Sequence, residues 1–186
     1  MKTKDLVLAS LFAAITCVLA IVSIPLPFTP VPITLHVFAI TLCGAVLGGK
    51  LGAFSQGIYV LLGAIGLPVY AGGNAGFGHL FGPTGGYIFG FILGAYVTGT
   101  LVQWGVKKVK MVKGRYMVIV FSMSMGLLAI YLCGMLQLMI VADMNIAQAF
   151  MGGVVPFIGF DFLKVIASSI IASVLRERLI KEAVIS

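Results

Sequence analysis

The chain has 186 residues, of which 61% are hydrophobic and only 9% are charged, and its formal net charge is +7. A soluble domain carries roughly 25% charged residues, so this composition excludes a soluble globular protein, a disordered chain and a disulfide scaffold. Residues 6–49, 51–106 and 116–142 contain no Asp, Glu, Lys or Arg, and Lys50 alone separates the first two stretches. Because a spanning helix needs about 20 mostly apolar residues, we predict an all-α integral membrane protein with a single domain over residues 1–186.

Six transmembrane helices are predicted, at about residues 4–24, 33–47, 51–65, 85–106, 115–142 and 156–175. Between the first two lie the prolines of residues 25–32, which remove amide donors and clash with preceding turns, so we expect a stiff, extended loop. Residues 66–84 are rich in glycine and predict a long irregular loop. A short connection holding Asp143 and Asn145 precedes the last helix.

The cations flank the apolar stretches. Every Lys and Arg except Lys164 lies near a terminus, at Lys50, or in the cluster at residues 107–115, which includes Lys110. Cytoplasmic loops carry an excess of Lys and Arg, so we predict cytoplasmic N and C termini and three charge-poor loops on the outer side. A nucleic-acid partner would need a basic patch on a soluble face, which is absent. The 107–115 cluster could contact anionic lipid headgroups.

Small residues recur at every fourth position, a spacing that lets helix backbones approach closely. The glycines are at positions 82, 86, 90 and 94, and at 44, 48 and 52. For the fourth helix we predict packing within the bundle. Ala9, Ala13 and Cys17 form a similar face on the first helix, which could pack internally or dock on a separate membrane protein.

The sequence carries no complete catalytic or metal motif. Residues 44–51 (GAVLGGKL) approach a phosphate-binding loop, but Leu51 stands where the magnesium-binding hydroxyl is required. No serine lies in a G-x-S-x-G motif, and no cysteine pair has metal-ligand spacing. His36 and His79 are interpreted as structural. We therefore predict that the chain is not an enzyme and has no ATPase site or metal site of its own.

Asp161 and Lys164 place two charges inside the predicted sixth helix. A charge at the bilayer centre costs about 2.5–3.5 kcal/mol on insertion scales, so such a residue faces the bundle interior and marks a site. Their i, i+3 spacing puts both on one helix face. A structural ion pair is the alternative. The loop around Asn74 favours a site, because its neighbouring glycines let backbone approach a ligand and the Asn74 amide both donates and accepts.

The chain resembles the BioY family, the biotin-specific substrate-binding (S) components of energy-coupling factor (ECF) transporters. The matching segments are residues 28–35 (FTPVPITL), 63–74 (GAIGLPVYAGGN), 82–87 (GPTGGY) and 156–164 (PFIGFDFLK). With the spacing between them they cover nearly the whole chain. Two positions depart from the pattern: Phe160 stands where a small residue often precedes the Asp, and His36 where glutamine is common.

The resemblance implies a prokaryotic plasma-membrane protein that captures biotin from outside, uses no cofactor, and works with an ECF transmembrane subunit and two cytoplasmic ATPases. It implies partner docking through Ala9 and Ala13. Asp161 and Asn74 would accept the ureido N–H groups, and Asn74 or Lys164 would donate to the ureido carbonyl. Whether Lys164 contacts the ureido end, the carboxylate or Asp161 stays open. The other substrate-binding candidates are Phe28, Tyr87, Phe160, Gly73, Gln56 and Tyr59.

A self-sufficient secondary transporter or facilitator for a vitamin-like solute is the alternative function. Such folds usually contain inverted repeats and ion-coupling groups, and no convincing repeat relates the two halves of this sequence. Which of the loops at residues 25–32 and 66–84 acts as a lid stays open.

Overall fold

The computed structural model describes residues 2–109 and 111–182, so Lys110 of the predicted cationic cluster and the ends of the predicted domain lie outside the described residues. The elements in chain order are α1 (Thr3–Ile21), β1 (Ser23–Leu26), β2 (Thr29–Thr34), α2 (His36–Leu47), α3 (Gly49–Ala64), the 3-10 turn η1 (Ala71–Gly73), α4 (Gly78–Phe81), α5 (Gly85–Lys108), α6 (Val112–Val141), α7 (Ile146–Gly153) and α8 (Val155–Lys181).

Helices occupy all six of the predicted positions, but they differ in length. Four of them, α1, α5, α6 and α8, are long and apolar enough to span a membrane. The other two, α2 and α3, have 12 and 16 residues. At 1.5 Å per residue they are about 18 and 24 Å long, shorter than the hydrocarbon core of about 30 Å. The chain is a multi-pass helical membrane protein, and its described residues contain four helices of spanning length.

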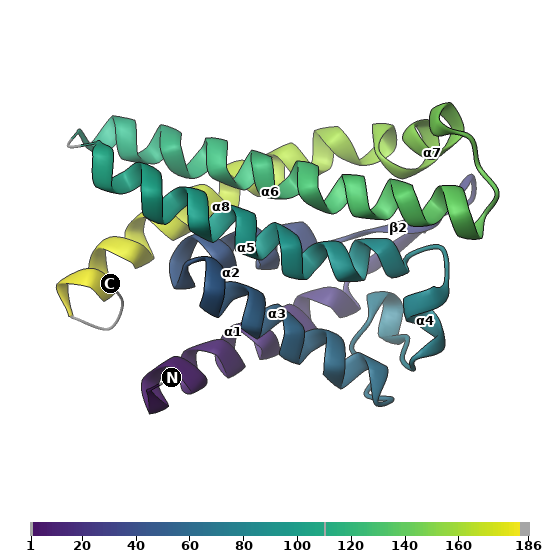
Figure 1. Cartoon of the computed structure of the whole chain (residues 1–186), viewed down its shortest axis with the longest axis horizontal. Coiled ribbons are helices and arrows are strands. Elements are labelled where there is room, and N and C mark those ends of the chain that lie inside the picture. Colours follow the sequence, from purple (N-terminus) through teal and green to yellow (C-terminus); the bar gives the residue numbers. More distant parts are fainter. Residues whose placement is uncertain (1, 110, 183–186) are drawn as a thin grey trace.

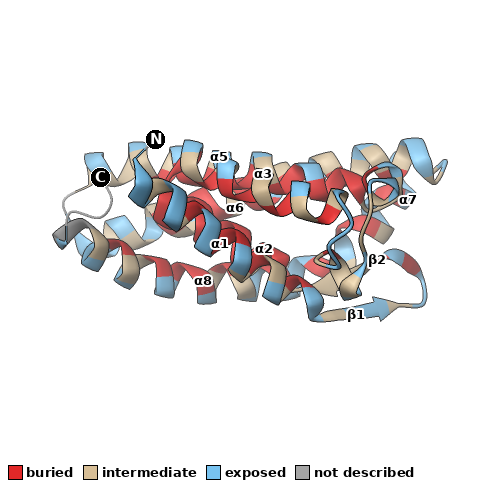
Figure 2. Ribbon diagram, turned by 90° about the horizontal axis from the view of Figure 1, so that it is seen from below, coloured by how far each residue is buried: buried red, intermediate tan, exposed pale blue. Residues whose placement is uncertain are grey.

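The helices lie along a common long direction, and the connections sort to two ends (Figure 1). Both labelled termini and the α5–α6 turn lie at one end, while β2, α4 and α7 lie at the other. Buried residues run through the middle of the bundle, whereas α1 and α8 turn exposed faces outward (Figure 2). The charge-poor connections thus share the end opposite the cationic ones, as the charge pattern predicted.

Residues 23–34 correct the all-α prediction. β1 and β2 pair as an antiparallel hairpin with Ser23 opposite Thr34, Ile24 opposite Ile33 and Leu26 opposite Thr29. The segment is extended, as its prolines predicted, but the pairing was missed because proline cannot donate to a ladder. A two-stranded sheet tolerates proline because both of its strands are edges. The prolines of residues 25–32 are therefore compatible with this hairpin.

A second element missed from the sequence is α7, which lies in what was predicted to be a short connection. Asn145 caps this helix: its side-chain oxygen accepts from the Gln148 N–H at 2.9 Å, and the Gln148 side chain accepts from the Asn145 N–H at 3.0 Å. This reciprocal arrangement satisfies two amide donors at the helix start. The element brings Gly152 and Gly153 against the hairpin and α5.

The predicted glycine packing is confirmed between α5 and α6. A Cβ built at Gly90 would lie 3.0 Å from Ile130 Cα, and one at Gly94 would lie 2.6 Å from Ile130 Cγ1. At Gly86 it would collide with the Cys133 carbonyl oxygen. Gly82, the first residue of the predicted series, precedes α5 and meets only the backbone of α4.

Gly86→Ala is expected to lower the free energy of unfolding by about 1–3 kcal/mol, because overpacking here acts against backbone that cannot yield. Gly57→Ala on α3 is the matched control, since nothing lies within 4 Å of an added Cβ there. Thermal unfolding in detergent measures both. Equal midpoints for the two variants would contradict close α5–α6 packing.

The alanine face of α1 packs internally. Ala9 and Ala13 are 0% and 1% exposed, and the Ser55 hydroxyl of α3 donates to the Ala9 carbonyl oxygen at 2.8 Å. These two residues therefore face the interior of the chain rather than a free surface. Docking of a partner through them stays a prediction.

Candidate ligand-binding cavity

A cavity of about 490 Å³ lies at the end of the molecule that holds the hairpin, η1 and α4. Its size is within the range of about 300–1,000 Å³ that small-molecule sites occupy. Apolar residues of α5, α6 and α8 form much of its wall, among them Phe91, Ile130 and Phe157. The polar lining residues are Ser23, Thr29, Thr34, His36, Tyr59, Tyr70, Asn74, His79, Thr84, Tyr87, Tyr131 and Asp161.

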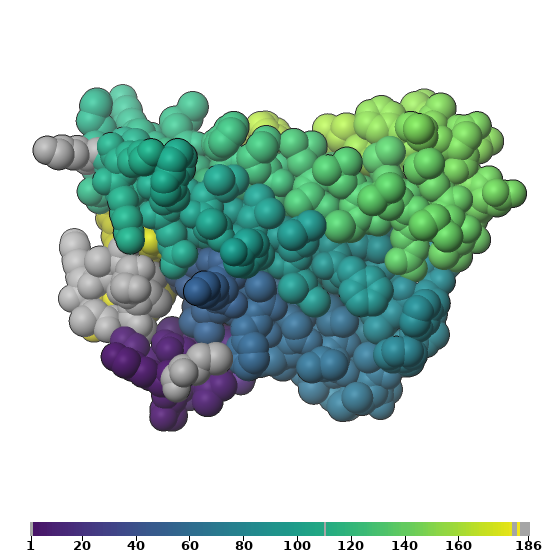
Figure 3. Space-filling view, in the orientation of Figure 1, coloured from purple at the N-terminus to yellow at the C-terminus, as the bar shows by residue number. Residues whose placement is uncertain are grey.

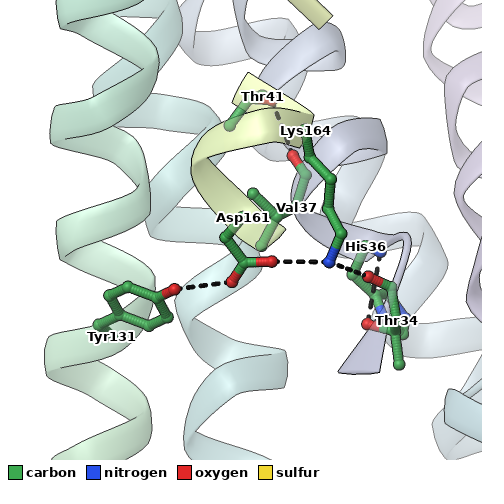
Figure 4. Close-up of polar contacts among 7 residues, drawn as sticks. All are labelled: Thr34, His36, Val37, Thr41, Tyr131, Asp161 and Lys164. Carbon is green, nitrogen blue, oxygen red and sulfur yellow. Dashed lines mark hydrogen bonds and ion pairs between the residues drawn. The ribbon is translucent and has the colours of Figure 1, made fainter. Parts of the chain in front are cut away.

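Asp161 is the acid of this cavity, and it is only 5% exposed. One carboxylate oxygen, Oδ1, lies 2.7 Å from Lys164 Nζ, and the other, Oδ2, accepts the Tyr131 O–H at 2.7 Å (Figure 4). Lys164 Nζ also donates to the Thr34 carbonyl oxygen at 2.6 Å. A buried charge needs such partners, because desolvation without them costs several kcal/mol. The carboxylate is thereby fixed between α6, α8 and β2.

Lys164 does not itself line the cavity. Its two bonds, to Asp161 and to Thr34, answer the open question of its partner within the chain: it pairs with Asp161. Further along α8, the Ser168 hydroxyl lies 3.0 Å from the Thr41 hydroxyl of α2. The sequence left a structural pair and a ligand site as alternatives; the structure contains the ion pair, and its acid lines the cavity. A role of Asp161 toward a ligand stays a prediction.

His36, Tyr59 and Phe91 contact one another in the wall of the cavity. The His36 ring nitrogens lie 2.8 Å from Thr34 Oγ1 and 2.7 Å from the Tyr59 hydroxyl. The ring stacks on Phe91 with centroids 4.7 Å apart and an interplanar angle of 22°. Both nitrogens are thus in hydrogen-bond contact with neutral hydroxyls, which fixes the orientation of the ring against Phe91. The structural interpretation of His36 from the sequence missed this position.

Tyr87 fits the cavity wall because two glycines leave room for it. Its ring fills the space where a Cβ of Gly134 would stand, and its hydroxyl fills the corresponding space at Gly153. The hydroxyl donates to the Gly153 carbonyl oxygen at 2.7 Å. The Tyr87 hydroxyl therefore contacts α7, and we expect its ring to face the cavity that Tyr87 lines. This agrees with the apolar wall expected of Tyr87.

Asn74 lies at the mouth of the cavity, which we define by its exposed lining residues Pro25, Pro30, Gly72 and Asn74. Its side-chain N–H donates to the Ala71 carbonyl oxygen at 2.8 Å, which holds the amide at the rim. Gly72 has φ +67°, a conformation that glycine adopts without strain. The turn η1 thereby carries Asn74 to the cavity.

Besides Lys164, four candidates from the sequence lie outside the cavity lining. Phe28, at the hairpin tip, is 67% exposed, and Phe160 is 54% exposed on the outer face of α8. Gly73 is next to the lining residue Gly72 but does not line the cavity. Gln56 is fully buried and donates to Thr16 Oγ1 at 3.1 Å, so it joins α3 to α1. The structure gives none of the four a place against a ligand in this cavity.

Tyr131, His36, Thr34 and Tyr70 line the cavity and were missed. Tyr131 lies in the middle of a long apolar helix, where the sequence does not distinguish a lipid-facing aromatic residue from a cavity-facing one. His36 is the first residue of α2, and from the sequence it was interpreted as structural. Tyr59, a weaker candidate, does line the cavity.

Comparison with known proteins gives consistent results. The chain is 42% identical over 172 residues to a probable biotin transporter BioY of Pyrococcus horikoshii, covering 92% of this chain and 96% of that protein. It is 42% identical over 169 residues to the biotin transporter BioY of Thermotoga maritima, covering 91% and 94%. A crystal structure of the S-component for biotin from an ECF-type ABC transporter matches with a TM-score of 0.82 at 28% identity, over 95% of each chain. The sequence profile of the BioY family matches residues 1–181, and the chain therefore belongs to the BioY family.

Proposed function

We propose that this chain is the biotin-binding S component of an ECF-type transporter. The observation that carries the proposal is a buried carboxylate in a largely apolar cavity, held by Lys164 and Tyr131, in a chain of the BioY family. The chain is a non-catalytic membrane subunit, and energy for transport comes from a partner module. That module is one ECF transmembrane subunit and two cytoplasmic ATPases.

Biotin matches the chemistry of the cavity at its ureido ring and along its apolar part. Its ureido ring offers two N–H donors, and a carboxylate whose oxygens have lone pairs beyond those used by Lys164 and Tyr131 can accept them. The thiophane ring and the valeryl chain need apolar walls, which Phe91, Ile130 and Phe157 supply. In this arrangement Asp161 binds the ureido end, Lys164 orients Asp161, and Asn74 makes a polar contact at the mouth.

In this role the whole chain, residues 1–186, is one six-helix domain with both termini in the cytoplasm. The hairpin after α1 and the segment after α3 would extend α2 and α3 to the outer surface. The grouping of the cations at the end that holds the termini supports this orientation. The cavity then opens to the outside, where it captures biotin before the partner module drives release inward.

Equilibrium binding to the purified protein in detergent, without partners or nucleotide, tests the proposal. One biotin is expected to bind per chain, and dethiobiotin, which retains the ureido group, is expected to compete. The diamine that remains when the ureido carbonyl is removed is expected not to compete. Failure of biotin to bind would contradict the proposal. Biotin accumulation by vesicles that hold this chain alone would favour the secondary transporter instead.

A further inference from the structure

A second cavity, of about 670 Å³, lies at the opposite end of the molecule from the first. Its walls come from the C-terminal part of α5, the start of α6 and the last turns of α8. Figure 3 shows the start of α6 in teal at the same end as the last turns of α8 in yellow. The proposed function makes no use of this cavity.

A buried arginine lines this second cavity. Arg176 is 7% exposed, and its Nη1 donates to the Ala45 carbonyl oxygen at 2.9 Å. Its Nε is buried and has no hydrogen-bond partner among residues 2–109 and 111–182. Leaving a charged donor buried without a partner is unfavourable, and because Arg176 lines the cavity, an anion bound there would stabilise the charge of this guanidinium.

The other charged groups of the cavity are mostly cationic. Lys113 and Arg115 line it from α6, and Glu177 is its one acid among the described lining residues. Arg115 Nε already donates to the Val109 carbonyl oxygen at 3.1 Å, which leaves its terminal nitrogens for a ligand. The Tyr116 hydroxyl lies 3.1 Å from Ser169 Oγ, whose own proton goes to the Ile166 carbonyl oxygen at 2.7 Å, so Tyr116 is engaged within the chain. The excess of cations favours an anionic ligand.

The remaining lining residues are apolar and continue onto the outer surface. Val112, Met117 and Val174 line the cavity and are 70%, 67% and 51% exposed. Nearby on α5, Lys108 Nζ lies 3.4 Å from the Trp104 ring centroid, and Trp104 is 63% exposed. Exposed tryptophan is typical of the membrane–water interface. A cavity at this depth is open both to headgroups and to acyl chains.

We propose that this cavity binds an anionic glycerophospholipid. The phosphate contacts Arg176, Arg115 and Lys113, and an acyl chain lies along Val112, Met117 and Val174. A free phosphate would use only the charged part of the cavity and leave its apolar wall empty. A lipid uses both parts, with its phosphate beside the three cations and its acyl chain along the apolar residues.

Native mass spectrometry of the purified full chain, titrated with phosphatidylglycerol and phosphatidylcholine, tests this proposal. Phosphatidylglycerol is expected to bind about tenfold or more tightly than the zwitterionic lipid, and Arg176→Gln to weaken it about fivefold. Arg115→Gln is expected to have a similar effect, and because Arg115 is exposed, that variant keeps the test valid if Arg176→Gln fails to fold. Arg178→Gln, an exposed cation on the same helix outside the cavity, is the matched control and should bind as wild type.

Three outcomes would overturn the proposal. The first is equal affinity for the two lipids. The second is displacement of phosphatidylglycerol by inorganic phosphate alone, which would indicate a site for a soluble phosphate. The third is an effect of Arg178→Gln as large as that of Arg115→Gln, which would indicate diffuse attraction to the whole cationic end.

Discussion

Asp161→Asn is expected to raise the Kd for biotin about a hundredfold or more, because it removes the charged acceptor at the ureido end. The carboxylate of Asp161 is buried, and both of its oxygens are held by side chains of the chain itself. An amide in its place has one oxygen acceptor, which Tyr131 would occupy, and would turn donors toward the donors of the ureido ring. Isothermal titration with biotin measures the change.

The same substitution removes the counterion of Lys164, so a loss of binding must be separated from a loss of stability. Removing one partner of a buried pair costs about 3–5 kcal/mol, whereas replacing both with neutral groups is often harmless. The Asp161→Asn/Lys164→Met double variant is therefore expected to regain the wild-type unfolding midpoint while still failing to bind biotin. Asp143→Asn is the control, since Asp143 follows α6 at the same end, is exposed and does not line the cavity.

A double variant that binds biotin with nearly wild-type affinity would show that the Asp161–Lys164 pair only supports the fold. The assignment of Asp161 to the ureido ring would then be wrong. Loss of binding in Asp143→Asn would point in the same direction, because it would mean that any change of charge at this end affects affinity.

The features that could be predicted from the sequence are those that local chemistry determines. Apolar length places the helices, and proline and glycine end them, so helices were found at all six expected positions. The packing of Gly86, Gly90 and Gly94 follows from their spacing on one helix. Asp161 could be found because a charge within an apolar helix is rare. Each of these signals is contained within a few neighbouring residues.

The features that were missed depend on how the helices are rotated against one another. A membrane helix is apolar on its lipid face and on its packed face, so its sequence does not indicate which side points inward. Phe160 was therefore expected in the cavity and lies outside it, while Tyr131 and His36 were not expected and line it. Phe28 was also expected there, but it lies at the exposed tip of the hairpin, which the sequence did not predict. The hairpin was missed for another reason. Proline has no amide donor, so a proline-rich segment does not indicate strand pairing, although β1 and β2 do pair.

The structure also bears on which outer loop covers the cavity. The exposed lining residues that define the mouth come from two segments, Pro25 and Pro30 from the hairpin, and Gly72 and Asn74 from the loop that contains η1. The hairpin is held from below: Thr29 Oγ1 donates to the Gly152 carbonyl oxygen at 2.7 Å, and Lys164 Nζ donates to that of Thr34 at 2.6 Å. We therefore expect biotin to enter as the η1 loop separates from an anchored hairpin.

A disulfide between these two segments is expected to stop biotin exchange. A Cβ built at Gly72 would lie 3.8 Å from Ser23 Cβ, which is close to the mean of about 3.8 Å for disulfides. In the Ser23→Cys/Gly72→Cys variant, oxidation after loading should slow the release of radiolabelled biotin about a hundredfold or more, since release then needs movement elsewhere in the packed bundle. Reduction with dithiothreitol should restore the rate.

The controls are the single substitutions Ser23→Cys and Gly72→Cys, each of which also retains the native Cys17, Cys43 and Cys133. Neither can form the new disulfide, so each should exchange biotin at the same rate under oxidising and reducing conditions. The Gly72→Cys single variant also reports the strain of a side chain at φ +67°, which costs roughly 1–2 kcal/mol. Exchange at the wild-type rate in the fully oxidised double variant would contradict entry between the hairpin and the η1 loop. It would place the route between other elements that line the cavity.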